Sequence, residues 1–296
     1  MTMPIDLHIH THASEDGEFS PRKIFDLAGG LGLRAIAFAD HDTVASVGEG
    51  VALSKATGID FAPAVEITTQ TEGYDLHLLG YFIDWRSPRL HRVLSRSAER
   101  RVDTVATRAQ LLRGLGFTIT LEDILKDAAG RPPGTASILN ALKTHPENLK
   151  CADFARYITG DKSDRPVYNF YRDYLFTGGP AFVDMRTMST VEAIALVHEL
   201  GGAAVLAHPG RTPAELVDRL LGAALDGLEV FCSTHSAEDS ARFGEYARRH
   251  GLLETAGSDF HGPSIKPDIV FGADLPGGTY EMFTALRERA DQRRRR

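Results

Sequence analysis

Short apolar segments alternate with amphipathic ones near both ends of the chain. Apolar runs of strand length occupy residues 5–10, 35–42, 59–68, 76–83, 203–208, 227–232 and 252–259. A helical spacing of apolar positions occupies residues 21–32, 44–57, 190–200, 213–224 and 236–250. The first of these helices has Ser20-Pro21 at its start and glycine at its end, as is typical of helix termini. Strands that alternate with helices predict a parallel sheet with right-handed crossovers.

The pattern changes between residues 88 and 180. A charged helical run extends from Arg89 to Arg113, and short polar helices follow, broken at GRPPG (130–134) and THPEN (144–148). This stretch contains no strand pattern. We therefore expect two parts. Residues 1–87 and 181–296 would form an α/β domain, and residues 88–180 would form an all-helical insertion that caps it.

Composition narrows the function classes. With 296 residues, 43% apolar and 25% charged, the chain is typical of a globular protein with a sizeable core. A net charge of -7 argues against a generic nucleic-acid surface but allows a small phosphorylated substrate. Cys151 and Cys232 alone predict no disulfide framework, which favours a reducing, cytoplasmic location. We find no signal peptide and no apolar run near the roughly 18 to 20 residues of a membrane span. The terminal Arg293–Arg296 run is interpreted as a frayed, solvated end rather than a nucleic-acid tail.

Residues able to bind metal ions lie on predicted strands or at their ends, in both halves of the chain. His8 and His10 share one face of the first strand, close enough to chelate one ion. A histidine taken alone is usually a surface or core residue, but chance does not explain so many at strand ends. His12 is interpreted as a neighbour of the site. The candidate ligands are His8, His10, Asp16, His41, Glu66, His77, His208, Asp259 and His261. Imidazole and carboxylate groups are ligands for Mn, Fe or Zn.

Six segments carry a family resemblance. They are DLHIHTHASEDG (6–17), FADHDT (38–43), VEI (65–67), LHLLG (76–80), AHPGR (207–211) and GSDFHG (257–262). In this order they resemble the PHP (polymerase and histidinol phosphatase) family of amidohydrolase-like metal hydrolases. GLEVFCSTHS (227–236) and the place of the insertion are similar to its TrpH-like or YciV-like branch. The resemblance implies a distorted (β/α)7 barrel with two or three divalent metal ions.

The resemblance also implies how the ligands are shared. One ion would be held by His8, His10, Glu66 and Asp259, a second by Glu66, His77 and His208, and a third by Asp16, His41 and His261. Two departures from the branch pattern affect the site. Glu15 is inserted before Asp16, which makes Glu15 the alternative ligand, and Pro133 replaces a histidine that could contact substrate.

The implied activity is that of a metal-dependent phosphoesterase, because clustered divalent ions supply hydroxide at neutral pH and neutralise phosphoryl charge. The branch favours a nucleotide 3′,5′-bisphosphate or the 5′-phosphorylated end of a short oligoribonucleotide. The alternatives are a cyclic-phosphate or sugar-phosphate hydrolase, histidinol phosphate phosphatase, and a non-catalytic module that binds metal or nucleotide.

Further residues have expected roles around the ions. Asp259 is expected to be catalytic as well as a ligand, and His235 or His208 is the candidate general acid. Asp40 and Asp42 are expected to orient imidazoles. The candidate contacts to substrate phosphate are Arg131, Arg186, Arg211, His235 and Lys266.

Overall fold

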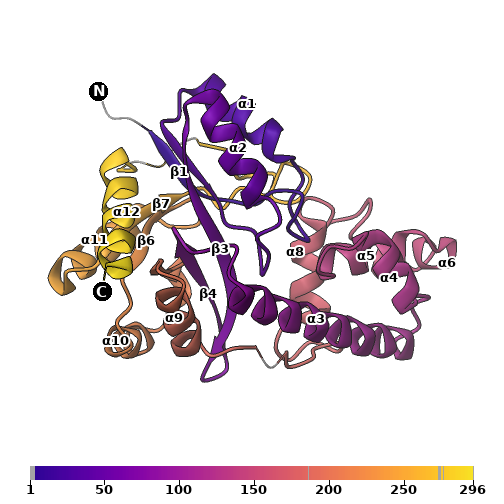
Figure 1. Ribbon diagram of the computed structural model, residues 1–296. Coiled ribbons are helices and arrows are strands. Elements are labelled where there is room, and N and C mark those ends of the chain that lie inside the picture. Colours follow the sequence, from indigo (N-terminus) through magenta and orange to yellow (C-terminus); the bar gives the residue numbers. More distant parts are fainter. Residues whose placement is uncertain (1–3, 186, 273–274, 276, 296) are drawn as a thin grey trace.

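The structure is a computed structural model that describes residues 4–185, 187–272, 275 and 277–295 (Figure 1). Seven strands form one sheet in chain order. They are β1 (Ile5–Ile9), β2 (Ala35–Phe38), β3 (Asp60–Thr71), β4 (Tyr74–Tyr81), β5 (Ala203–Leu206), β6 (Gly227–Cys232) and β7 (Leu253–Gly257). Each lies within or overlaps a run that the sequence pattern assigns to a strand.

The sheet is mixed rather than wholly parallel. β1, β2 and β3 run parallel, as do β5, β6 and β7, but β4 pairs antiparallel with both β3 and β5. The expectation of a parallel sheet is therefore wrong for β4. The reason is the two-residue connection between Thr71 and Tyr74, which is long enough for a hairpin and too short for a parallel crossover.

The sheet curls into a nearly closed barrel. The backbone N–H of His10 donates to the carbonyl of Phe260 at 2.9 Å, and that of Asp259 donates to the carbonyl of His8, also at 2.9 Å. These bonds join β1 to the segment that follows β7, so the first and last strands meet. The distorted seven-stranded barrel expected from the sequence is confirmed.

Helices surround the barrel (Figure 1). They are α1 (Pro21–Leu31), α2 (Val47–Thr57), α9 (Thr190–Glu199), α10 (Ala214–Gly222), α11 (Ala237–His250) and α12 (Tyr280–Arg294), with a short 3-10 turn η2 (Pro209–Arg211) after β5. The apolar faces of α1, α2, α9, α10 and α11 pack on the outer face of the sheet. Phe283 and Leu286 of α12 join a second core made largely of small strand residues such as Ala37 and Ala64. None of the helices in the described part is both long and apolar enough to cross a membrane.

The prediction of a frayed C-terminus is wrong for Arg293 and Arg294. Arg293, in the last turn of α12, donates to the two carboxylate oxygens of Asp226 at 2.9 and 3.0 Å. Arg294 donates to the carbonyl of Phe82 at 2.7 Å. These arginines have acceptors provided by distant parts of the chain, of which Asp226 is buried, and the contacts hold α12 against the barrel. Arg296 lies outside the described residues.

Residues 88–180, all of which the structure describes, contain helices joined by turns and no strand. This insertion contains α3 (Pro88–Gly114), α4 (Leu121–Ala128), α5 (Thr135–Lys143), α6 (Pro146–Leu149), α7 (Ala152–Ala155), α8 (Pro166–Phe170) and a π-helical turn η1 (Tyr171–Leu175). We call residues 88–180 the cap. Side chains from Val105 to Ala181 form a hydrophobic core of their own. In Figure 1, α3 leads away from the barrel, α4, α5 and α6 lie beside its far part, and α8 lies nearer the barrel.

Candidate metal centre

Glu66 of β3 lies fully buried among imidazoles from four parts of the chain. Its Oε2 atom is 3.2 Å from Nε2 of His8, 3.2 Å from Nε2 of His10 and 3.0 Å from Nδ1 of His41. His8 and His10 point the same way because alternate residues of a strand share a face. Their Nε2 atoms are 3.1 Å apart. One carboxylate oxygen therefore faces three imidazole nitrogens.

The other oxygen of Glu66 faces a different pair of histidines. Its Oε1 atom is 2.9 Å from Nδ1 of His77 on β4 and 3.2 Å from Nε2 of His208, which follows β5. β4 is the strand that pairs antiparallel with β3, and this pairing places His77 opposite Thr68, two residues from Glu66. A carboxylate with a separate imidazole group at each oxygen has the arrangement of a bridging ligand.

Asp259 brings a second carboxylate to His8 and His10. Its Oδ1 atom is 3.3 Å from Nε2 of His10 and 3.6 Å from Nε2 of His8. Nζ of Lys266 lies 2.6 Å from the other oxygen, Oδ2. Burial alone would raise the pKa of Asp259, but Lys266 and His261 outweigh it and hold that pKa well below its usual range. Asp259 is thus ionised, with one oxygen directed to the imidazoles.

Asp16 is the carboxylate of a third group. Its Oδ2 atom is 3.7 Å from Nε2 of His41 and 3.4 Å from Nε2 of His261, and His10 completes this group. Glu15 points elsewhere and accepts a hydrogen bond from the backbone of Ala136 in the cap. Of the two acidic neighbours in the sequence, the structure therefore brings Asp16 to the histidines.

The donor atoms fit divalent cations. Buried polar atoms normally have hydrogen-bond partners. Among the described residues, four atoms of this centre are buried without one: Glu66 Oε2, His41 Nδ1, His77 Nδ1 and His261 Nε2. Burial, together with His261 and His41 nearby, lowers the pKa of His10 to about 3. His10 is then neutral, and neutral imidazole is the form that binds metal ions.

Glu229 is a member of the site that the sequence analysis did not assign. This fully buried carboxylate on β6 lies 2.9 Å from Nδ1 of His8 through Oε1, and its Oε2 accepts from the backbone N–H of His208 at 2.8 Å. A hydrogen bond of this kind fixes which nitrogen of a histidine is free to bind metal. The available signal was an acidic residue in the middle of the apolar strand GLEVFC.

Asp40 and Asp42 do not have the expected role. Asp40 accepts from the backbone N–H of Thr11 at 2.6 Å and from the Ser46 hydroxyl, while Asp42 pairs with Arg101 of the cap at 2.7 Å. Both carboxylates are therefore engaged with the loop and the cap. The prediction that they orient imidazoles is wrong for the hydrogen bonds of the described residues, because these other groups occupy their oxygens.

Backbone strain is concentrated beside the strand ends of this centre. Asp42, His208 and Asp259 have φ angles of 51°, 28° and 58°, a left-handed region that residues other than glycine rarely adopt. Such conformations persist where the surrounding structure holds them and are frequent at functional sites. Here they turn His208 and Asp259 toward the carboxylate and imidazole cluster.

The residues expected to contact the substrate differ in their surroundings. Nδ1 of His235 lies 3.0 Å from the carbonyl of Val230, and its Nε2 is buried without a hydrogen-bond partner. Arg131 donates to backbone carbonyls, among them Ala128 at 3.0 Å. The backbone of Arg211 lies in η2, but its side chain and the whole of Arg186 are outside the described residues.

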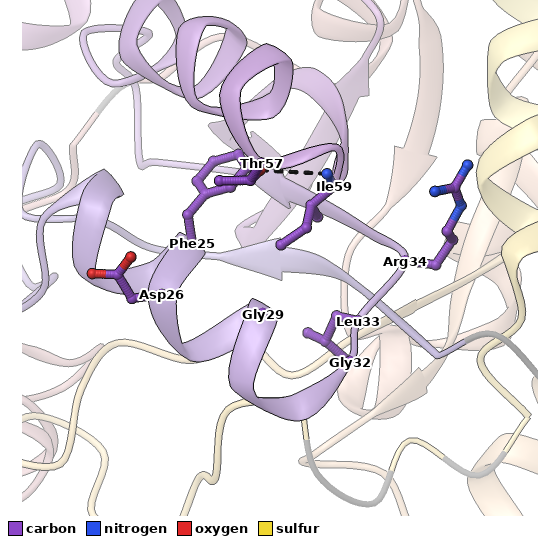
Figure 2. Close-up of a pocket in the computed structure, with 8 residues that line it drawn as sticks. All are labelled: Phe25, Asp26, Gly29, Gly32, Leu33, Arg34, Thr57 and Ile59. Atoms are coloured by element: carbon purple, nitrogen blue, oxygen red, sulfur yellow. Dashed lines mark hydrogen bonds between the residues drawn. The ribbon is translucent and has the colours of Figure 1, made fainter.

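Two hollows on the surface lie away from this cluster. Figure 2 shows one between α1 and α2, where Arg34 and Ile59 precede β2 and β3, at the strand ends opposite to those that carry the ligands. The second lies between barrel and cap and is lined by Trp85, Leu94 and Arg131, among other residues. Neither includes a member of the histidine cluster, so we locate the chemistry at Glu66.

The comparisons with known proteins agree with this geometry. A profile of the PHP domain matches residues 6–122. The 5′-3′ exoribonuclease Rnm of Escherichia coli is 30% identical over 91% of this chain and 88% of its own. This chain belongs to the PHP family. A 3′,5′-nucleoside bisphosphate phosphatase from Chromobacterium violaceum is 29% identical over 92% of both chains.

A solved structure supports the same assignment for the whole PHP chain. A candidate metal-dependent phosphoesterase from Bifidobacterium adolescentis superposes with a TM-score of 0.81 over 96% of each chain, at 28% identity. The enzyme class expected from the sequence, a metal-dependent phosphoesterase, is confirmed. The identity and number of the metal ions are matters for proposal.

Proposed function

We propose that this PHP phosphoesterase hydrolyses a nucleotide that carries two phosphates, with a 3′,5′-bisphosphate as the first candidate. The 5′-phosphorylated end of a short oligoribonucleotide presents the same chemical groups and is the second. The observation that carries the proposal is the convergence on Glu66 of imidazoles with unpaired nitrogen atoms. The activities named for the Chromobacterium and Escherichia relatives support the substrate class.

The centre would hold two or three divalent ions of Mn, Fe or Zn. His8, His10, Glu66 and Asp259 would bind one, Glu66, His77 and His208 a second, and Asp16, His41 and His261 a third. The distances of 2.9–3.7 Å between their nitrogen and oxygen atoms support these sets. When bound, such ions supply a nucleophile at neutral pH and neutralise charge on the phosphoryl oxygens.

His235 is our candidate for the general acid. In hydrolysis, water adds to phosphorus, the P–O ester bond breaks and the leaving oxygen needs a proton. The carbonyl of Val230 can only accept, so Nδ1 of His235 carries a hydrogen and the proton would leave from Nε2. His208 suits this role less, because its Nε2 faces Glu66 at 3.2 Å.

Lys266 and three arginines are the proposed contacts to the phosphate groups of the substrate. The ammonium group of Lys266 contacts Asp259, and from there it could also contact a phosphoryl oxygen of the substrate. Arg131 would need to exchange a carbonyl partner for the phosphate. Arg186 and Arg211 are proposed from their sequence positions alone. We propose that Asp259 is catalytic as well as a ligand, because it lies beside both Lys266 and the His8–His10 pair.

We also propose a cytoplasmic location. Both cysteines are free thiols, with Cys151 exposed and Cys232 buried. An exposed free cysteine is compatible with a reducing compartment, where disulfides are rare.

A substrate panel tests the proposed function. Phosphate release by Mn-loaded protein would be measured from adenosine 3′,5′-bisphosphate, a 5′-phosphorylated oligoribonucleotide, 2′,3′-cyclic AMP and histidinol phosphate. We expect turnover of the first two to exceed that of the others. Faster turnover of cyclic AMP or histidinol phosphate would contradict the substrate class, and inactivity on all four by Mn-bound protein would favour a sugar phosphate or a binding module.

Removal of a single ligand should abolish turnover. His10→Ala deletes an imidazole donor and Asp259→Asn removes a carboxylate charge from the group around Glu66, so we expect activity to fall by at least about three orders of magnitude while the fold persists. Phosphate release and circular dichroism measure the two effects. Turnover equal to that of the unsubstituted enzyme in either variant would contradict the assignment of the centre.

A further inference from the structure

Glu15 contacts the cap from a loop of the metal centre. Its Oε1 atom accepts a hydrogen bond of 2.6 Å from the backbone N–H of Ala136, in the first turn of α5. A carboxylate is stabilised at this end of a helix by the helix dipole. Gly134 provides the necessary space, because a Cβ atom at this position would lie 2.3 Å from Oε2 of Glu15. The carboxylate therefore occupies a fitted position on the cap.

Arg131 adds a second connection at the same place. Its Nη1 donates to the carbonyl of Glu15 at 3.3 Å and to that of Ser14 at 3.5 Å. The same guanidinium donates to the carbonyls of Ala128 at 3.0 Å and Asp127 at 3.3 Å, at the end of α4. Both α4 and α5 are thus attached to residues 14–15 of the barrel.

The residues on either side of Glu15 face the metal centre instead. The Ser14 hydroxyl donates to Oδ1 of Asp16 at 3.0 Å and accepts from the backbone N–H of His41 at 3.2 Å. The other carboxylate oxygen of Asp16 faces His41 and His261. Three consecutive residues therefore contact the cap and the third ligand group.

The loop that carries these residues is closely packed. The backbone N–H of Ser14 donates to the carbonyl of Thr11 at 3.0 Å. A Cβ atom at Gly17 would lie 1.8 Å from that same carbonyl oxygen, so only glycine fits there. A loop closed on itself in this way has little freedom to absorb a displacement of Glu15. A shift of Glu15 would therefore also move Asp16.

We propose that Glu15 is a positioning residue that couples the seating of the cap to cation binding at Asp16, His41 and His261. The inference rests on the proposed function, since it takes this group as a cation site. Such coupling is reciprocal: a cation that fixes Asp16 holds the cap, and a cap that moves away weakens cation binding. Cap motion would thereby change the occupancy of this ion while the groups at Glu66 keep theirs.

Two measurements on the full chain, freed of metal by a chelator, test the coupling. Mn²⁺ binding followed by electron paramagnetic resonance gives the affinity of each site, and hydrogen exchange with and without Mn²⁺ reports on residues 121–143. The variants are Glu15→Ala, Glu15→Gln, Gly134→Ala and the double variant Glu15→Ala/Gly134→Ala. Glu288→Ala, at an exposed position on α12, is the charge-matched control.

In the unsubstituted chain we expect Mn²⁺ to slow exchange in residues 121–143. Glu15→Ala should weaken the weakest Mn²⁺ site on the order of tenfold and remove the effect of Mn²⁺ on this segment. The tighter sites should be unchanged. Glu15→Gln, which keeps an acceptor oxygen, should retain most of the affinity. Gly134→Ala should act like Glu15→Ala, and should add nothing in the double variant, because the alanine Cβ then has room.

Other results would overturn the inference. If Glu15→Ala bound every Mn²⁺ ion as tightly as the unsubstituted chain, with the same protection of residues 121–143, Glu15 would have no coupling role. If Glu15→Ala failed to fold, Gly134→Ala alone would decide, since it adds one methyl group and leaves Glu15 in place. An unsubstituted chain that bound none of the divalent ions of Mn, Fe and Zn would overturn the proposed function, and the inference with it.

Discussion

Glu229 shows how one residue can orient two members of the centre. One of its oxygens contacts the ring of His8 and the other accepts from the backbone of His208, whose φ of 28° is strained. The backbone N–H of His208 always donates, whereas the ring of His8 can donate to this carboxylate only with a hydrogen on Nδ1. Nε2 of His8 is then the free nitrogen that faces Glu66.

Glu229→Gln tests this orientation. The amide has the same shape, but its NH2 group would face one of the two N–H donors, so one contact must be lost. We expect Mn²⁺ affinity to fall about 10- to 100-fold with the fold preserved, as for other residues that orient ligands. Competition with a chelator measures the affinity.

Glu254→Gln provides the matched control on the neighbouring strand. Glu254 lies on β7 and pairs with Arg248 at 3.5 Å, away from the imidazoles. Its Mn²⁺ affinity should equal that of the unsubstituted chain. If Glu229→Gln behaved like this control, Glu229 would have no part in orienting His8.

At the scale of the elements, α12 is attached to the sheet through one buried carboxylate, that of Asp226. Asp226, which precedes β6, accepts from Arg289 at 2.6 Å and from Arg293, both on α12, and from the ring of His198 on α9. Its Oδ2 also accepts from the backbone of Ala204. One carboxylate therefore joins two helices to the sheet, and its removal would leave Arg293 without that partner.

Asp226→Asn should destabilise the chain by about 3 kcal/mol at pH 7, since one partner of a buried ion pair is lost. Burial alone would raise the pKa of Asp226, but His198 and Arg293 outweigh it and lower that pKa. The contribution is thus present above the unfolded-state pKa of about 4 and declines as the pH falls below it. Urea unfolding at pH 7 and at lower pH should show the difference shrinking in acid.

Asp26→Asn, at an exposed position on α1, is the control for Asp226→Asn. It should unfold like the unsubstituted chain at every pH. A difference between Asp226→Asn and the unsubstituted chain that stayed constant as the pH fell would show that the carboxylate charge is not the source of the stability.

At the scale of the whole molecule, the closure of the barrel and the metal centre share the same residues. The hydrogen bonds that join the two ends of the sheet involve His8, His10 and Asp259. Cations bound there would link β1 to the segment after β7 in addition to these bonds. The barrel as a whole should therefore be more stable with ions than without them.

Mn²⁺ should raise the free energy of unfolding. A ligand that binds only the folded chain contributes about 2.7 kcal/mol per site when present at 100 times its dissociation constant. Urea unfolding with Mn²⁺ and with a chelator measures the change. Asp259→Asn should show a smaller effect, and an effect of equal size in this variant would mean that the stabilising ion binds elsewhere.

Most of the barrel could be predicted from the sequence, because its strands are short apolar runs bounded by turns and its ligands are chemically distinctive. The antiparallel direction of β4 depends on the short connection after Thr71, which the alternation of strands and helices does not indicate. The Arg293–Arg296 run at the end of α12 resembles a solvated tail until its partner Asp226 is known. Glu15 was similarly ambiguous. Its acceptor role depends on Ala136, a contact between residues 121 positions apart that local patterns cannot indicate.

The meeting of β1 with the segment after β7 has a consequence for protein synthesis. His8 and His10 leave the ribosome roughly 250 residues before Asp259, a delay of roughly 12 to 50 s at ordinary translation speeds. Throughout that time the two histidines lack Asp259, one of the two carboxylates that face them in the folded chain. The chain can therefore bind metal ions with its full set of ligands only after residues 257–261 have been translated. Ribosome-stalled chains that end before Gly257 should therefore bind Mn²⁺ more weakly than the released full chain.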